Sequence, residues 1–204
     1  MYSEVVWNVI ATMSLPEAHQ ERYLTNYQTY IDKFGKADAK GVVDNIINSK
    51  FYSALRAKDE TVLEEALAML REYGDASQEN SMKMAYYQRT DNWASLVEAG
   101  NALAQAQGYE GKGGSFNSAA WTMYEKCEDQ ALLAVATDWM HQVVLKEDSY
   151  AYLDTYAALL FKTGQTGLAM KWANRAIATG KKNNEDVSGT EALIKQYQET
   201  DSNE

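Results

Sequence analysis

Proline, cysteine and histidine are scarce in this chain, and their scarcity excludes several classes of protein. The 204 residues include 1 Pro and 12 Gly, too few for the many tight turns of a β-sandwich or β-barrel. The 1 Cys allows neither an internal disulfide bond nor a cluster of thiolate metal ligands, and 2 His leave little for a histidine-based metal site. We therefore expect this chain to hold no metal ion and no other cofactor.

Long basic and long apolar runs are also missing. Residues 1–100 contain 15 Asp+Glu against 10 Lys+Arg, residues 101–204 contain 14 against 9, and the net charge is −10. Because proteins that bind nucleic acids neutralise phosphates with Lys and Arg, we expect no nucleic-acid partner. No apolar run approaches the ~18 residues of a membrane span, and Met1–Glu4 lacks the basic start of a signal peptide. We expect neither direct membrane insertion nor a signal peptide in this chain.

Apolar residues recur at helical spacing along the whole sequence. Between residues 16 and 34 they follow one another at steps of three and four, which predicts one amphipathic helix that Gly35 ends. Ser14 and Glu17 have the spacing of a capping box at the start of this helix.

The same periodicity predicts the rest of the helices. Asp59 is typical of a residue that caps a helix, and Gly74 of one that stops it. Further helices are expected at about 38–55, 77–89, 92–107, 116–126, 129–146, 149–163, 166–180 and 189–199. Alternation typical of strands is nowhere sustained over five residues.

One break interrupts the helical pattern, at residues 108–115, where four Gly predict a flexible loop. It is not a phosphate-binding P-loop, because Lys112 is followed by Gly113 instead of Ser or Thr. We expect an all-α protein of about ten to eleven antiparallel helices, folded as a single domain over residues 1–204 with a core that continues across this loop. Residues 200–204 are expected to form a frayed tail.

Two tryptophans indicate an internal repeat, since Trp139 and Trp172 stand 33 positions apart with matching small and aliphatic neighbours. The second copy, residues 150–181, resembles a tetratricopeptide (TPR) repeat. The resemblance lies in Leu153, Tyr156, Ala157, Leu160, Gly164, Ala169, Ala176 and Ile177. Gly164 matches the left-handed turn between the two helices, whereas Thr166, Ala173 and Lys181 depart from the pattern. The resemblance implies a TPR-like helical-repeat solenoid.

A second resemblance covers most of the chain. It lies in the segments 27–36, 42–44, 117–125, 150–157 and 171–177, which are similar to the helical C-terminal region of certain exported bacterial thioredoxin-family proteins. In that family a redox domain of thioredoxin fold precedes the helical region. This chain has no Cys-x-x-Cys and no βαβ pattern, so we expect it to be the helical part alone. The resemblance implies export to the periplasm or cell envelope, and a thioredoxin-like domain as an adjacent partner.

The TPR resemblance also implies which side chains contact a ligand. In TPR proteins the first helix of each pair lines the concave face of the solenoid. Carried onto residues 150–181 and onto the unit 33 positions earlier, the expected contact residues are Asp154, Ala158, Phe161, Lys162, Trp121 and Glu125, with Glu128 and Asp129.

Side chains suited to catalysis are few and poorly placed. Cys127 precedes Glu128 and Asp129, whose carboxylates oppose the thiolate, so we interpret it as structural. His19 and His141 have no His or Cys at the spacing of metal ligands. Motifs for serine nucleophiles, zinc hydrolases and calcium loops are absent.

Two hypotheses for function follow. The first is a non-catalytic helical-repeat module that binds a protein or peptide, because solenoids use their concave surfaces in this way. The alternative is a helical enzyme domain that acts on an exported polymer with an acid pair from helices distant in sequence. Two carboxylates, or a carboxylate and His141, in a deep apolar cleft would favour the alternative.

Overall fold

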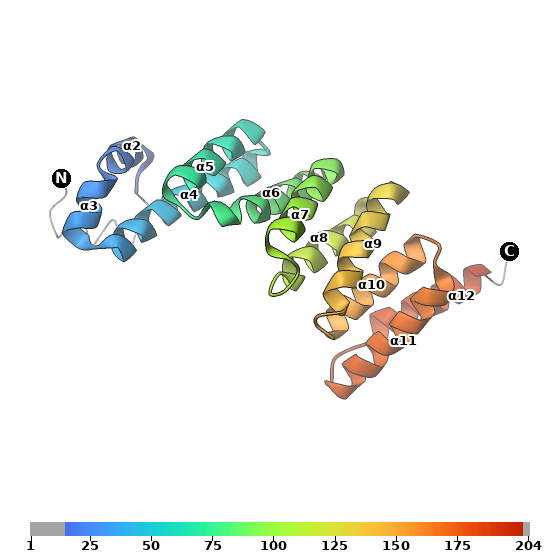
Figure 1. Ribbon diagram of the computed structural model, residues 1–204. Helices are drawn as coiled ribbons and strands as arrows, with labels where there is room; N and C mark the ends of the chain where they lie inside the picture. Colours follow the sequence, from blue (N-terminus) through green and yellow to red (C-terminus); the bar gives the residue numbers. More distant parts are fainter. Residues whose placement is uncertain (1–14, 202–204) are drawn as a thin grey trace. The chain divides into compact units, whose positions relative to one another are not determined.

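The computed structural model describes residues 15–201, and all regular structure in that range is helical (Figure 1). This part of the chain contains eleven α-helices and one short 3₁₀ helix, and no β-strand. The prediction of an all-α protein is confirmed. Ser14, the expected capping residue, lies outside the described residues.

The chain divides into two compact units, Met1–Met82 and Lys83–Glu204. The described helices of the first unit are α2 (Glu17–Thr25), α3 (Tyr27–Phe34), α4 (Lys36–Ala57), α5 (Glu60–Tyr73) and η1 (Ala76–Gln78). Helix α6 (Glu79–Thr90) begins in the first unit and ends in the second. The expected single domain over residues 1–204 stays a prediction.

The first helices depart from the sequence prediction at one position. The helix expected over 16–34 is broken at Asn26, whose backbone is not helical and whose side-chain amide donates to the carbonyl of Arg22 at 2.8 Å. Asn is prone to such breaks because its side chain competes for backbone hydrogen bonds. The predicted end of α3 is confirmed, since Gly35 has φ of +89°, a conformation that favours glycine.

Helices α4 and α5 lie side by side and form the core of the first unit (Figure 1). The cap predicted for α5 is confirmed, because the Asp59 carboxylate accepts hydrogen bonds from the N–H groups of Thr61 and Val62 at 2.9 and 3.3 Å. Gly74 ends the helix as expected. The large apolar side chains that these two helices bury are Val42, Val43, Ile46, Ile47, Phe51, Leu63, Leu67 and Leu70, together with Ala66.

The second unit continues with six helices in chain order. They are α7 (Trp93–Gln107), α8 (Gly113–Lys126), α9 (Gln130–Val144), α10 (Tyr150–Lys162), α11 (Thr166–Lys182) and α12 (Ser188–Asp201). Helix α8 packs against α9 and α10, α10 also packs against α9, α11 and α12, and α7 packs against α9. The turn residue Gly164 has φ of +78°, as the sequence predicts.

Part of the expected flexible loop is helical. Helix α8 begins at Gly113, which is buried, and a Cβ atom there would lie 2.9 Å from the ring of Tyr152 on α10. Glycine is needed at this position for a close approach between two helices, which is a packing requirement and not a flexibility requirement. Residues 200 and 201, expected in the frayed tail, belong to α12, and residues 202–204 lie outside the described residues.

Candidate functional site

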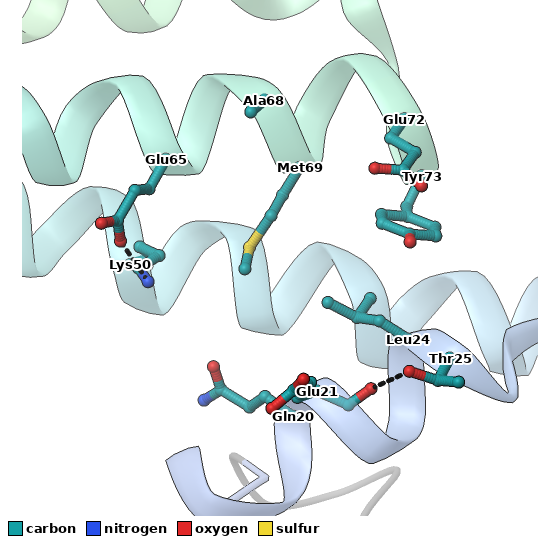
Figure 2. Close-up of a pocket in the computed structure, with 10 residues that line it drawn as sticks. All are labelled: Gln20, Glu21, Leu24, Thr25, Lys50, Glu65, Ala68, Met69, Glu72 and Tyr73. Atoms are coloured by element: carbon teal, nitrogen blue, oxygen red, sulfur yellow. Dashed lines mark hydrogen bonds and ion pairs between the residues drawn. The ribbon is translucent and has the colours of Figure 1, made fainter.

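A groove with a volume of about 600 Å³ lies between three helices of the first unit (Figure 2). Helix α2 forms one wall, α5 the other, and α4 contributes Lys50. The lining residues are Gln20, Glu21, Leu24, Thr25, Lys50, Glu65, Ala68, Met69, Glu72 and Tyr73. We call this the α2–α5 groove.

The apolar part of the α2–α5 groove comes from both walls. Met69 extends from α5 and Leu24 from α2 into the space between the helices (Figure 2), and both side chains are half-buried. Tyr73 closes one end, where its ring meets the ring of Tyr27 edge-on at 6.0 Å between centroids. The groove therefore offers a strip of apolar surface that water still reaches.

The rim of the α2–α5 groove is acidic. Glu21, Glu65 and Glu72 are exposed carboxylates, and Lys50 is the single cation among the lining residues. The Lys50 ammonium lies 2.5 Å from the Glu65 carboxylate, so its charge is already neutralised. Glu21 and Glu72 thus give the groove a net negative charge, at a place where a ligand can reach both.

A second hollow of about 460 Å³ extends the groove, since both are lined by Gln20, Lys50 and Glu65. It adds the side chains of Leu15, Ser49, Ser53 and Val62. The Gln20 amide donates to the backbone carbonyl of Leu15 at 3.0 Å, which fixes the chain just before α2. The two hollows therefore form one continuous surface along α2, α4 and α5.

The position of α2, and with it the groove wall, depends on Tyr23. This side chain is completely buried, its hydroxyl donates to the carbonyl of Ala39 on α4 at 3.0 Å, and its ring stacks on Tyr30 at 4.5 Å. Burial raises the pKa of the Tyr23 hydroxyl, which keeps it protonated as a donor. Because Leu24 follows directly in the helix, it projects beside this anchor and faces the groove.

Two of the residues expected to contact a ligand are not accessible, so that part of the sequence prediction is wrong. Ala158 is 0% and Phe161 2% exposed. Helix α12 packs against α10, where the ring of Tyr197 stacks on Phe161 at 4.3 Å between centroids.

Asp154 and Lys162 are engaged in contacts within the protein. The Asp154 carboxylate accepts a hydrogen bond of 2.5 Å from the hydroxyl of Thr190, which is fully buried. The Lys162 ammonium donates to the carbonyl of Tyr124 at 2.7 Å and lies 3.2 Å from the Glu128 carboxylate. Both side chains therefore make contacts between segments of the protein and are not free for a ligand.

The remaining expected contact residues lie on and just after α8. Trp121 is half-buried with its ring 5.1 Å from that of Tyr124, and Glu125 is exposed. Asp129 has a structural role, because its carboxylate accepts hydrogen bonds from the N–H groups of Ala131 and Leu132 at the start of α9. Ligand contact at Trp121 and Glu125 stays a prediction.

Asp154 is expected to make stability depend on pH. Burial raises its pKa, and the hydrogen bond from Thr190 offsets this only in part. Because the native state then binds the proton more tightly than the unfolded state, its contribution to stability is largest at low pH and is lost as pH rises through the raised pKa. Asp154→Asn should raise the free energy of unfolding at pH 7 and change it less at pH ~3, below the ordinary pKa of an Asp carboxyl. Urea unfolding at both pH values measures this, with the exposed Asp138→Asn as the control. A gain equal at both pH values would contradict the assignment.

The residues considered for catalysis occupy structural positions. Cys127 is 1% exposed, and burial raises the pKa of its thiol, which disfavours the reactive thiolate. His141 is half-buried, with its ring stacked on Tyr156 at 5.6 Å. Among the described residues, no three His, Cys, Asp or Glu side chains are grouped so that they could hold a metal ion.

Comparison of the chain with protein-family models, curated proteins and solved structures finds no match. Within residues 15–201, no helix is both long enough and apolar enough to cross a membrane. The α2–α5 groove is the largest hollow described above, and its residues lie on three helices that the sequence places up to 53 positions apart, from Gln20 to Tyr73.

Proposed function

We propose that this chain is a non-catalytic, TPR-like helical module that binds a protein or peptide segment in the α2–α5 groove. The observation that carries the proposal is the apolar strip of Leu24 and Met69 between the exposed carboxylates of Glu21 and Glu72. Apolar surface supplies most of the binding free energy, and charge selects the partner. The fitting partner segment carries a large apolar side chain next to Lys or Arg.

The volume and the negative charge of the groove suit a segment of a protein better than a nucleic acid or an anion. A volume of about 600 Å³ accommodates a few side chains of one amphipathic helix, a recurring mode of peptide recognition. The net charge of −10 attracts basic segments at long range and repels polyanions.

The packing of the second unit supports a TPR-like repeat. Helix α8 contacts α9 and the next-but-one helix α10, and α7 contacts α9, as expected when helix pairs stack in two rows. The resemblance to the helical region of thioredoxin-family proteins supports two further parts of the proposal. These are an exported location and a thioredoxin-like domain as one partner to test.

The alternative of a helical enzyme finds little support in the groove. An acid that donates a proton near neutral pH requires an apolar surround. Glu21, Glu65 and Glu72 are instead exposed, and Glu65 is paired with Lys50.

Peptide titration tests the proposed function. The probe is a fluorescent helical peptide with Leu and Lys in alternate helical turns, and the same peptide with Glu for Lys is its negative partner. We expect the basic peptide to bind with a Kd of about 10–100 μM, as for a small groove without a deep pocket, and the acidic peptide not to bind. Glu72→Lys should weaken binding about fivefold or more, and Met69→Asp should abolish it.

The matched control is Glu98→Lys, which makes the same charge change at an exposed position of α7 in the second unit. It should leave the Kd nearly unchanged, and circular dichroism should show that all three variants are folded. Equal weakening by Glu72→Lys and Glu98→Lys would mean that the peptide senses only net charge, and the proposal would then be wrong.

A further inference from the structure

A second surface, on α11, carries the opposite charge. Leu168 and Trp172 are one helical turn apart, and Lys171 and Arg175 form a parallel pair beside them. These four residues line a shallow hollow of about 340 Å³, and Leu168 is 39% exposed. We call this surface the α11 face. Apolar side chains next to the Lys171 ammonium are the chemistry that the α2–α5 groove is expected to select.

The α11 face is held in a fixed arrangement. The Arg175 guanidinium lies over the Trp172 ring at 5.1 Å from its centroid and forms an ion pair of 2.7 Å with Asp148. The Trp172 ring also packs edge-on against Tyr156, at 5.1 Å between centroids. Binding therefore immobilises little beyond Lys171 and Leu168, which keeps the entropic cost low.

We propose that the α11 face of one copy of this chain docks into the α2–α5 groove of a second copy. In this arrangement Leu168 and Trp172 meet Leu24 and Met69. The Lys171 ammonium approaches the carboxylates of Glu21 and Glu72, while Arg175 keeps its ion pair with Asp148. The inference rests on the proposed function only in using the same groove, and it names a second copy as one occupant.

Such an interface joins two different surfaces, so a bound pair still has one groove and one α11 face free. Interfaces of this kind continue from copy to copy and form open chains unless the geometry closes a ring. Two molecules of charge −10 also repel each other, and the surfaces involved are small. The association is therefore weak, and it responds to concentration and to salt.

Sedimentation velocity from about 10 μM to about 1 mM, the range of a small interface, tests the inference. The sedimentation coefficient of the wild type should rise steadily with concentration. Lys171→Glu, which disables the face, and Glu72→Lys, which disables the groove, should each remain monomeric. Lys182→Glu, an exposed charge change near the end of α11, is the control and should behave as wild type.

A mixture of the two monomeric variants gives the sharpest result. The intact face of Glu72→Lys can dock only into the intact groove of Lys171→Glu, so the mixture should form pairs and nothing longer. A wild-type sedimentation coefficient that does not change with concentration overturns the inference, and so does a mixture that stays monomeric.

A failure of self-association can be distinguished from a failure of the proposed function. Lys171→Glu keeps an intact groove and should still bind the basic peptide. If the peptide binds while the wild type stays monomeric, the proposed function stands and self-association is wrong.

Discussion

Trp139→Ala should lower the free energy of unfolding by about 3–5 kcal/mol, whereas Trp172→Ala should lower it by less than half as much. The two residues stand 33 positions apart in the sequence, but their surroundings differ. Trp139 is 1% exposed, and Trp172 is only half-buried on the α11 face. The difference arises because truncation of a buried ring leaves a cavity, while truncation of an accessible ring admits water.

The contacts of Trp139 explain why no neighbour can fill the space it leaves. A Cβ atom at Gly100 on α7 would lie 2.4 Å from Cζ2 of the indole, so the ring and the α7 backbone are in direct contact. The indole N–H donates to the side-chain carbonyl of Asn101 at 2.9 Å, and Phe116 packs against the ring at 5.5 Å between centroids. Trp139→Ala therefore removes at once the contacts that this ring on α9 makes with α7 and with Phe116 of α8.

Urea unfolding followed by circular dichroism measures both substitutions, with Trp172→Ala as the matched control. Because Trp172 belongs to the α11 face, the same control should also weaken self-association while leaving most of the stability. Equal losses of stability in the two variants would show that Trp139 is not the more deeply packed residue.

The helices were predictable because their signals are local. Spacing of three and four between apolar residues depends only on the helix itself, and the cap at Asp59 and the turns at Gly35 and Gly164 depend on their own backbone. The break at Asn26 was missed since the apolar spacing continues through it. Gly113 was read as loop because a glycine needed for close packing looks the same in sequence as one needed for flexibility.

Burial was not predictable from the 33-residue spacing of the expected repeat. Trp139 and Trp172 match in that spacing, yet Trp139 is buried against Gly100 of α7 and Trp172 is only half-buried. Whether a neighbouring helix covers a position depends on elements outside the repeat, and the pattern of the repeat itself contains no information about them.

The α2–α5 groove was missed for a related reason. Glu21, Glu65 and Glu72 look in sequence like ordinary solvated residues on helix surfaces, which is what most such residues are. They become the rim of a groove only because the fold brings them beside Leu24 and Met69, on helices that are distant in sequence. The available signal was Met69 between Glu65 and Glu72, an apolar residue within an acidic stripe of one helix.

Phe161→Ala should lower the free energy of unfolding by about 3–5 kcal/mol, because the residue belongs to the core and not to a binding surface. Phe161 is 2% exposed, and its ring stacks on Tyr197 of α12 at 4.3 Å with an angle of 11° between the planes. Near the other end of α12, Thr190 donates to Asp154, and Val187 packs against Gly180. Truncation of Phe161 should therefore loosen α12 as well as leave a cavity under it.

Urea unfolding and hydrogen exchange along α12 measure this together. Glu125→Ala is the matched control, since Glu125 was expected on the same ligand-binding face but is exposed, and exposed substitutions usually change stability by less than about 0.5 kcal/mol. Faster exchange in α12 with Phe161→Ala, and none with Glu125→Ala, is the expected pattern. If Phe161→Ala instead left the stability unchanged and altered only the binding of a partner, α12 would not cover α10 in solution. The concave face expected from the repeat would then be the binding surface after all.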